Sequence, residues 1–366
     1  MVPFKNITIV GVGLIGGSLG LAVKRKFPEL HITGVSSEKT LEGALNAGAI
    51  DRGVAKPDLA KGVAEADLVF LCNPIAQILT LLPQVAKSIK EETLVTDVGS
   101  TKLKIVEMAS RYFTEKKYFL GGHPMTGSEG RGIENADTLL FENSVYVLTP
   151  QQNIPAAITR NFGNLLESIG AKVLFIDPAM HDKVAAGISH LPQMLAVSLV
   201  NLISKYDQDS HLFLKLAAGG FRDMTRIASS PYEIWKDILD TNHEKLSEFI
   251  DEFIAVLRNN QKHLTDEILS DAFREAAHHR LSIPRDTKGF LRPHYDLSIR
   301  VEDKPGVIAE IATALAAEQI NIKDIEVLKV REGDSGTIRI SLETPEAREQ
   351  ARRILKKIGY SSSFRN

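Results

Sequence analysis

The first half of the chain alternates short apolar runs with segments whose apolar residues recur at helical spacing. The runs have the length of buried strands, and the segments between them repeat every three or four positions. This alternation predicts an α/β domain in which helices cover both faces of a parallel sheet. The last predicted strand ends near Asp177, so we expect a first domain over 1–177. The predicted strands are 7–12, 32–35, 68–72, 94–98, 118–120, 144–148 and 172–176.

The hydrophobic pattern changes twice more along the chain. Over 178–284 the strand signal disappears and apolar residues follow helical spacing, with coverage wider than one stripe. Such coverage predicts burial on several sides and therefore association with a second subunit, although a large intramolecular bundle is the alternative. Residues 285–294 form a basic, proline-containing linker. Residues 295–366 follow the order β-α-β-β-α-β of a ferredoxin-like domain.

Composition narrows the class of protein. The chain has 366 residues, 25% of them charged and 43% hydrophobic, with a formal net charge of −2. These values give no sign of a nucleic-acid or membrane partner, and we identify no apolar stretch near the roughly 20 residues that span a bilayer. The single cysteine, Cys72, excludes an internal disulfide and suits a reducing compartment. We therefore expect a cytoplasmic protein, and no residue set has the spacing of metal ligands.

A glycine pattern, G-x-G-x-x-G, follows the first predicted strand and opens a helix. In this context Gly11 makes the tight turn, Gly13 lets a pyrophosphate approach the backbone, and Gly16 packs the helix on the strand. Together with Leu14 and Ile15, these residues predict a dinucleotide site at the helix N-terminus.

The end of the second strand leaves the choice between NAD and NADP open. The acidic residue that usually holds the ribose 2′-hydroxyl of NAD is missing there, and Ser36 and Ser37 stand in its place. Glu38 could supply the carboxylate from the loop. Alternatively, the two serines and Lys39 could receive the 2′-phosphate of NADP.

Candidate chemistry gathers at the carboxyl edge of the predicted sheet. His123 precedes a proline, which favours extended geometry, and we expect it on a loop just past strand 118–120, where ligands bind in open α/β sheets. A neutral imidazole there can accept the proton of a hydroxyl whose carbon loses hydride. After strand 94–98, Ser100 or Thr101 is either a helix N-cap or a hydroxyl beside the nicotinamide.

The helical region carries further candidates. His190 lies two residues before Pro192, whose missing N–H predicts a kink; the histidine is either a core residue or faces the cleft. After Gly219, Arg222 and Arg226 are either surface residues at the start of a helix or ligands for a carboxylate.

With these motifs the chain resembles prephenate dehydrogenases of the TyrA type that carry a C-terminal ACT domain. The motifs stand in family order: 11–16, 97–102, 122–129, 189–192, and 219–226 followed by Trp235. The loop after the first strand of the last domain resembles the ACT ligand loop. The effector-binding residues that this implies are Asp303, Pro305, Gly306, Val307, Asn321 and Ile322.

The resemblance implies oxidative decarboxylation of prephenate to 4-hydroxyphenylpyruvate with NAD or NADP, a step of tyrosine synthesis. It implies that His123 accepts a hydrogen bond from the ring C4 hydroxyl, which Ser100 orients. It implies that Arg226 binds the ring carboxylate, with Gly219 and Arg222 as further substrate-binding residues. It also implies that His190 and Trp235 enclose the substrate and that Glu129 gates the site.

The resemblance also implies a homodimer, in which each active site can include residues of the other subunit, and L-tyrosine as the expected inhibitor. Two alternative functions stay open. One is an arogenate dehydrogenase, with the same chemistry on an amino-bearing side chain. The other is a non-catalytic amino-acid sensor that keeps the nucleotide fold, which intact His123, Ser100 and Arg226 disfavour.

Overall fold

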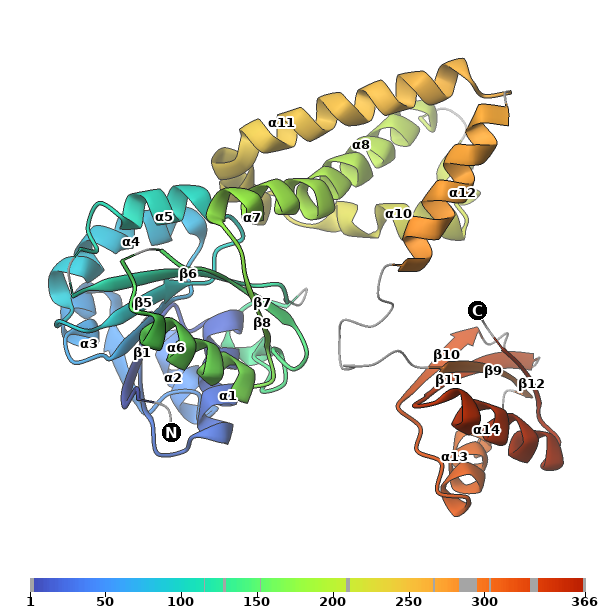
Figure 1. Cartoon of the computed structure of the whole chain (residues 1–366), viewed down its shortest axis with the longest axis horizontal. Helices are drawn as coiled ribbons and strands as arrows, with labels where there is room; N and C mark the ends of the chain where they lie inside the picture. The colour runs from blue at the N-terminus through green and yellow to red at the C-terminus, as the bar shows by residue number, and fades with distance from the viewer. Residues whose placement is uncertain are drawn as a thin grey trace. The chain divides into compact units, whose positions relative to one another are not determined.

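The chain divides into two compact units, Met1–Arg280 and Leu281–Asn366 (Figure 1). The computed structural model describes residues 3–114, 116–127, 130–151, 153–208, 211–265, 267–282, 295–302, 304–329 and 335–364. The predicted linker over 285–294 lies outside these described residues.

An eight-stranded sheet forms the centre of the first unit, with the strand order β3-β2-β1-β4-β5-β6-β7-β8. Its strands are β1 (Asn6–Val10), β2 (His31–Ser36), β3 (Arg52–Ala55), β4 (Leu68–Leu71), β5 (Leu94–Asp97), β6 (Tyr118–Pro124), β7 (Val145–Thr149) and β8 (Lys172–Phe175). The helices are α1 (Leu14–Lys26), α2 (Glu38–Asn46), α3 (Leu59–Val63), α4 (Ile75–Ser88), α5 (Leu103–Ala109) and α6 (Ala156–Ser168).

Helices cover both faces of this sheet, as the alternation of the sequence predicts. Along β4, Leu68 and Phe70 join one core, which α1, α2 and α6 complete, while Val69 and Leu71 join the other, which α3, α4 and α5 complete. Because both faces are buried, the central strands are continuous apolar runs and not alternating ones. The predicted α/β nucleotide-binding class is confirmed.

Two features of the sheet differ from the prediction. The strand β3 was not predicted, because it is short and only Val54 in it is buried. The sheet is also not parallel throughout, since β6 and β7 pair antiparallel. Between them the described residues contain only a short 3-10 turn, η2 (Ile133–Asn135). For β7 to pair parallel with β6, the connection would have to cross over the sheet, usually as a helix. Without that helix, β7 runs back beside β6 in the opposite direction.

The helical part of the first unit follows β8. It comprises α7 (Pro178–Ala185), the π-helical turn η3 (Ala186–His190), α8 (Leu191–Tyr206), α9 (Leu212–Lys215), α10 (Gly219–Thr225), the 3-10 turn η4 (Arg226–Ser229), α11 (Tyr232–Lys262) and α12 (Glu267–Ser282). Here α7, η3 and α8 run on as one helix, Pro178–Tyr206. Judged by length and composition alone, it is the one helix among the described residues that could cross a membrane. The sequence predicts a kink before Pro192, but the π turn continues the helix through that position, which gives the helix this length.

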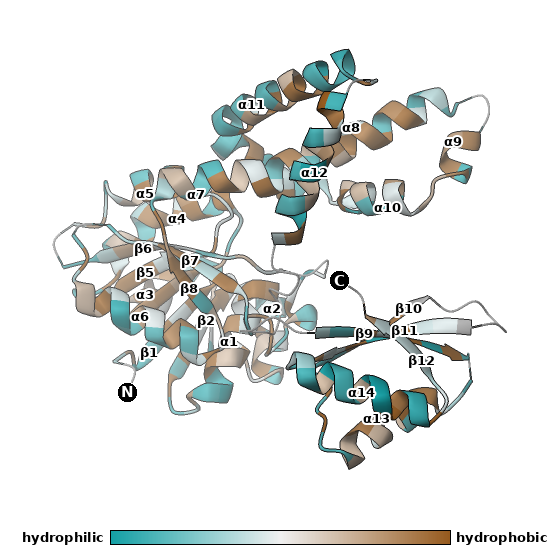
Figure 2. Ribbon diagram, turned by 45° about the vertical axis from the view of Figure 1, so that its right-hand side comes forward, coloured by the Kyte–Doolittle hydropathy of each residue, from teal (hydrophilic) through white to brown (hydrophobic). Residues whose placement is uncertain are grey.

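Apolar side chains on this helical part are exposed in unusual number. In Figure 2, α8 and α9 are coloured mostly as hydrophobic. An apolar surface of this extent on a single chain marks a contact with a partner, which is what the wide apolar coverage of the sequence predicts. The most exposed of these side chains are Ile188, Tyr206, Leu216, Met224, Tyr232, Leu264, Phe273 and Leu281.

The second unit has the predicted β-α-β-β-α-β order. Its elements are β9 (Tyr295–Glu302), α13 (Val307–Ala317), β10 (Asp324–Lys329), β11 (Ser335–Leu342), α14 (Pro345–Lys357) and β12 (Ser361–Phe364). They form a four-stranded antiparallel sheet in the order β10-β11-β9-β12. Alternate residues of β9, among them Leu297 and Ile299, pack under the two helices with Ile311 and Leu355. The ferredoxin-like arrangement is thus confirmed.

Candidate functional site

The glycine-rich turn between β1 and α1 has the geometry of a pyrophosphate cradle. Gly11 adopts a positive φ of 91°, and its N–H donates to the carbonyl oxygen of Val35 at 2.9 Å. A Cβ on Gly16 would lie 2.2 Å from the Gly11 carbonyl oxygen, whereas a Cβ on Gly13 would meet nothing within 4 Å. The first turn of α1 has no side-chain cap. Open space above Gly13 and free helix N–H groups fit the phosphates of a dinucleotide.

The adjoining end of β2 is rich in hydroxyl groups. Ser36 is buried, and Ser37 is the N-cap of α2, where its hydroxyl lies 2.9 Å from that of Thr40. A cavity of about 160 Å³ lies beside this strand end and is lined by Val35 and Lys56, among others. Lys56 had no signal in the sequence, because it stands alone in a 3-10 turn after β3.

His123 lies within β6 and not on a loop, which corrects the prediction. The pairing of β6 with β5 stops at Leu120, and beyond that residue β6 continues against β7, so that His123 pairs with Val147. The antiparallel return of β7 keeps this segment extended. His123 nevertheless lies past the carboxyl edge of the parallel strands, where it was expected.

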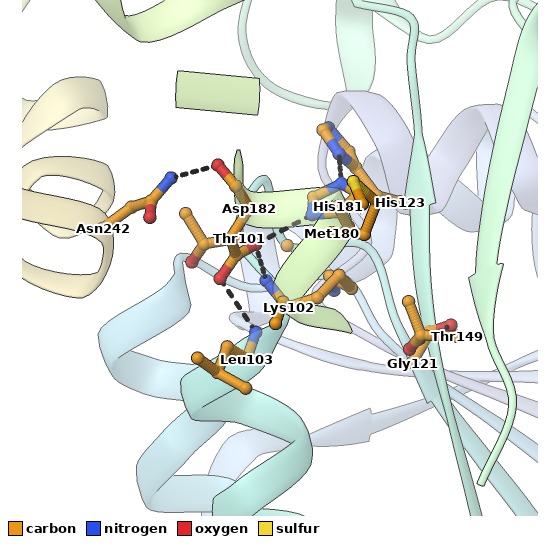
Figure 3. Close-up of polar contacts among 12 residues, drawn as sticks. Thr101, Lys102, Leu103, Gly121, His123, Thr149, Met180, His181, Asp182 and Asn242 are labelled. Carbon is orange, nitrogen blue, oxygen red and sulfur yellow. Dashed lines mark hydrogen bonds and ion pairs between the residues drawn. The ribbon is translucent and has the colours of Figure 1, made fainter. Parts of the chain in front are cut away.

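His123 begins a series of three hydrogen-bonded side chains (Figure 3). Its Nδ1 lies 2.8 Å from Nε2 of His181, and Nδ1 of His181 lies 2.8 Å from Oδ1 of Asp182. A carboxylate can only accept, so His181 donates from Nδ1 and accepts at Nε2 the hydrogen that His123 donates from its own Nδ1. The network therefore leaves Nε2 of His123 as a free proton acceptor.

Asp182 also caps a helix that lies 80 residues earlier in the chain. It accepts the backbone N–H of Lys102 at 2.7 Å and that of Leu103 at 2.9 Å, at the start of α5. The expectation that Ser100 or Thr101 might be this cap was wrong: α5 has no local side-chain cap, and the Thr101 hydroxyl lies 2.7 Å from that of Thr241.

The environment of His123 keeps its imidazole neutral. Burial holds the pKa of His123 well below its ordinary value, and the nearby charges of His181, Lys102 and His190 act in the same direction. A neutral imidazole with one free nitrogen is a proton acceptor. Ser100, on the loop between β5 and α5, is half-buried at the same sheet edge.

His190 is a buried residue with polar and aromatic partners. It closes the π turn η3, so the predicted irregularity before Pro192 is a π turn. Its Nδ1 lies 3.3 Å from Nδ2 of Asn242, and its ring meets that of Trp235 edge to face, with centroids 6.0 Å apart. Burial lowers the pKa of His190 to about 4. The structure thus brings His190 and Trp235 together, as expected.

The two arginines lie at the surface of the helical part. Arg222 is exposed on α10, which begins at Gly219, and Arg226 is exposed at the start of η4. Glu129, the expected gate, lies outside the described residues.

In the second unit, a cavity of about 540 Å³ lies at the start of α13. Pro305, Gly306 and Val307 line it, and Gly306 has a positive φ of 94°. Of the other residues expected to bind an effector, Asn321 is exposed and Ile322 packs against the core. Asp303 lies outside the described residues.

His181 and Asp182 were not predicted from the sequence. They form an ordinary His-Asp pair in an amphipathic helix, and only the packing of α7 beside α5 brings them to His123. A buried Gln193, whose carboxamide oxygen has no partner among the described residues, was also missed.

Fold and site together define a dinucleotide-binding dehydrogenase. The family models of the prephenate dehydrogenase nucleotide-binding domain, the prephenate dehydrogenase dimerisation domain and the ACT domain match residues 19–175, 177–276 and 295–360. The prephenate dehydrogenase of Bacillus subtilis (strain 168) is 38% identical over 356 residues, which cover 96% of this chain and 95% of that protein. The chain belongs to the prephenate dehydrogenase family.

Two solved structures resemble the first unit in particular. Prephenate dehydrogenase from A. aeolicus in complex with hydroxyphenyl propionate and NAD+ has 28% identity and a TM-score of 0.71, and covers 76% of this chain and 98% of that one. Synechocystis arogenate dehydrogenase has 30% identity and a TM-score of 0.66, and the match covers 75% of this chain and 97% of that one.

Proposed function

We propose that this chain oxidises and decarboxylates prephenate to 4-hydroxyphenylpyruvate, with His123 as the proton acceptor for the C4 hydroxyl. The observation that carries the proposal is the series His123–His181–Asp182 at the carboxyl edge of a dinucleotide-binding sheet. The A. aeolicus relative supports it, because its bound hydroxyphenyl propionate shares a hydroxyphenyl ring and a carboxylate side chain with that product.

The series gives His123 both the tautomer and the orientation that the reaction needs. Nε2 of His123 takes the hydroxyl proton, and the imidazolium that forms keeps its Nδ1–H bond to His181, which Asp182 supports through its own charge. The Ser100 hydroxyl orients the substrate hydroxyl. A bound nicotinamide supplies the acceptor for the hydride from C4. Loss of the ring carboxylate makes the ring aromatic, so the protein has to supply positioning and one base, and no nucleophile.

Substrate binding is assigned to the helical part. Arg226 binds the ring carboxylate, since a guanidinium and a carboxylate form paired hydrogen bonds, and Gly219 and Arg222 lie next to it in the same segment. His190 and Trp235 enclose the ring, and Glu129 gates the site. The exposed apolar surface of this part supports a homodimer in which the partner subunit completes the site.

For the cofactor we propose NAD, with NADP as the alternative. The NAD+ bound to the A. aeolicus relative supports the first choice. The absence of a carboxylate at the end of β2, and the nearby Lys56, favour tolerance of a 2′-phosphate. Titration calorimetry of NAD+ and NADP+ against the protein measures this preference without turnover.

For the second unit we propose L-tyrosine as an inhibitor that binds at Pro305, Gly306 and Val307. Truncation after Thr287 should leave turnover measurable and weaken the inhibition. Unchanged inhibition would assign this unit to oligomerisation, or tyrosine to the active site.

An arogenate dehydrogenase is the second candidate, which the Synechocystis relative favours. Steady-state rates with prephenate and arogenate, each with NAD+ and NADP+ and with or without tyrosine, decide between the two. We expect the highest kcat/KM with prephenate and NAD+. Turnover of neither substrate would leave the non-catalytic sensor as the function.

A further inference from the structure

A buried ion pair between Asp97 and Lys102 has no part in the chemistry proposed above. Both side chains are fully buried, and Nζ of Lys102 contacts Oδ2 of Asp97. Removing two charges from water costs free energy that their attraction only partly offsets, so such a pair is weak evidence for a stabilising role. The backbone groups that the pair binds indicate a different role for it.

The pair joins β5 and β6 where their own hydrogen bonds end. Asp97 is the last residue of β5, and the pairing of the two strands stops at Thr96 and Leu120. Beyond that point, the N–H of Gly122 donates to Oδ1 of Asp97 at 3.1 Å, and its carbonyl accepts from Nζ of Lys102 at 2.6 Å. Both backbone polar groups of Gly122, the residue before His123, are therefore fixed by the two side chains.

The same two residues also hold the loop that carries Ser100. The N–H of Gly99 donates to Oδ2 of Asp97 at 2.8 Å, and the backbone N–H of Lys102 donates to Oδ1 of Asp182. A Cβ on Gly122 would lie 2.7 Å from the Asp97 carbonyl oxygen, so the two segments lie too close for a side chain at Gly122. The loop before α5, the end of β6 and the carboxylate behind His181 thus meet at one buried pair.

We propose that Asp97 and Lys102 are positioning residues for the reaction at His123, because they fix the Ser100 loop, the His123 backbone and Asp182 relative to one another. This inference rests on the proposed function. The Lys102 ammonium has a second effect, since its charge helps to lower the pKa of His123. Among the described residues, the other titratable groups near His123 are His181 and Asp182 from α7, His190 from η3 and Asp97 at the end of β5.

Two variants separate positioning from stability. Lys102→Met removes the cation and leaves Asp97 buried without its partner, which should destabilise the fold. The double variant Asp97→Asn/Lys102→Met removes both charges and should recover much of the thermal midpoint. The matched control is Lys117→Met: Lys117 is partly buried, and its Nζ also donates to a backbone carbonyl, that of Ala86, at 2.7 Å.

We expect kcat with prephenate to fall about 100-fold in Lys102→Met, the scale of a small misplacement of reacting groups, with KM changed less than about threefold. Loss of the positive charge should also move the acidic limb of the kcat/KM profile to higher pH. The double variant should keep the low kcat although its thermal midpoint recovers. Lys117→Met should keep the wild-type kcat and pH profile.

Recovery of kcat together with stability in the double variant would overturn the proposal, and so would an unmoved acidic limb in Lys102→Met. If the wild type oxidises neither prephenate nor arogenate, the proposed function fails instead. In that case an NMR titration of the His123 ring, without substrate, still tests the charge effect: the ring should protonate at higher pH in the variant.

Discussion

The side chains around His123 and the two arginines differ in how far they are exposed to solvent. His123, His181, Asp182 and Lys102 all find polar partners within the chain. Arg222 and Arg226 extend from α10 and η4 at the surface. We infer that one folded chain organises the proton-accepting residues proposed above, whereas the arginines proposed to bind the carboxylate are exposed to solvent.

The sharpest way to break this comparison is His123→Asn. It removes the only nitrogen that the network leaves free to accept a proton, so kcat should fall by about two to four orders of magnitude. Nucleotide binding should be unchanged, which calorimetry can check. A variant with near-normal kcat would remove His123 from the mechanism.

The pH profile of the wild type belongs to the same test. A neutral histidine is the active form, so kcat/KM should decline as pH falls through the pKa of His123. Because burial lowers that pKa, the decline should begin below the ordinary imidazole range. A limb at or above that range would contradict the buried, neutral environment.

Asp182→Asn tests whether the series behind His123 matters. The amide no longer fixes the tautomer of His181, and kcat should fall by about 100-fold. Because the amide keeps only one acceptor oxygen, one of the two hydrogen bonds to the start of α5 is lost, which should also cost about 1 kcal/mol of stability. Asp177→Ala is the control for loss of a helix cap, because Oδ1 of Asp177 accepts the N–H groups of Ala179 and Met180 at the start of α7. It should lower the thermal midpoint and leave kcat unchanged; equal losses of kcat would reduce Asp182 to a helix cap.

Arg226→Ala tests the other half of the site. If substrate and partner subunit desolvate the guanidinium, loss of the charge-assisted contact should cost about 2 kcal/mol or more, which raises the KM for prephenate by about 30-fold. Arg222→Ala should have a smaller effect. The reverse ranking would move the carboxylate contact to Arg222.

The smallest expected effect concerns the cofactor. Ser36→Asp would place a carboxylate where the 2′-phosphate of NADP would lie, and should shift the kcat/KM ratio towards NAD about tenfold. If the wild type already prefers NAD over NADP by several orders of magnitude, Glu38 determines the cofactor preference, and Ser36 and Ser37 do not.

The features that could be predicted from the sequence are those that depend on residues close together in the chain. Gly11 is required by its positive φ, and Gly16 by its close approach to the Gly11 carbonyl oxygen in the same turn. The elements of the second unit follow the apolar periodicity of its sequence. The antiparallel return of β7, by contrast, depends on a connection without a helix. The contact between His123 and His181 spans 58 residues and depends on which face α7 turns towards α5. A histidine next to an aspartate in a helix carries no sign of that partner.

The π turn at Ala186–His190 also determines how α8 is rotated about the helix axis relative to α7. A π turn accommodates one residue more than an α-helix does, so the faces of α8 are rotated by about 100° from a straight continuation of α7. The face of α7 that carries His181 and the exposed apolar face of α8 are therefore set by one inserted residue. The close approach of Gly187 to the Phe249 ring, where a Cβ would lie 3.1 Å away, braces that turn against α11. A single-residue deletion there would leave both helices intact. It would rotate the exposed apolar face of α8 relative to the sheet edge that carries His123.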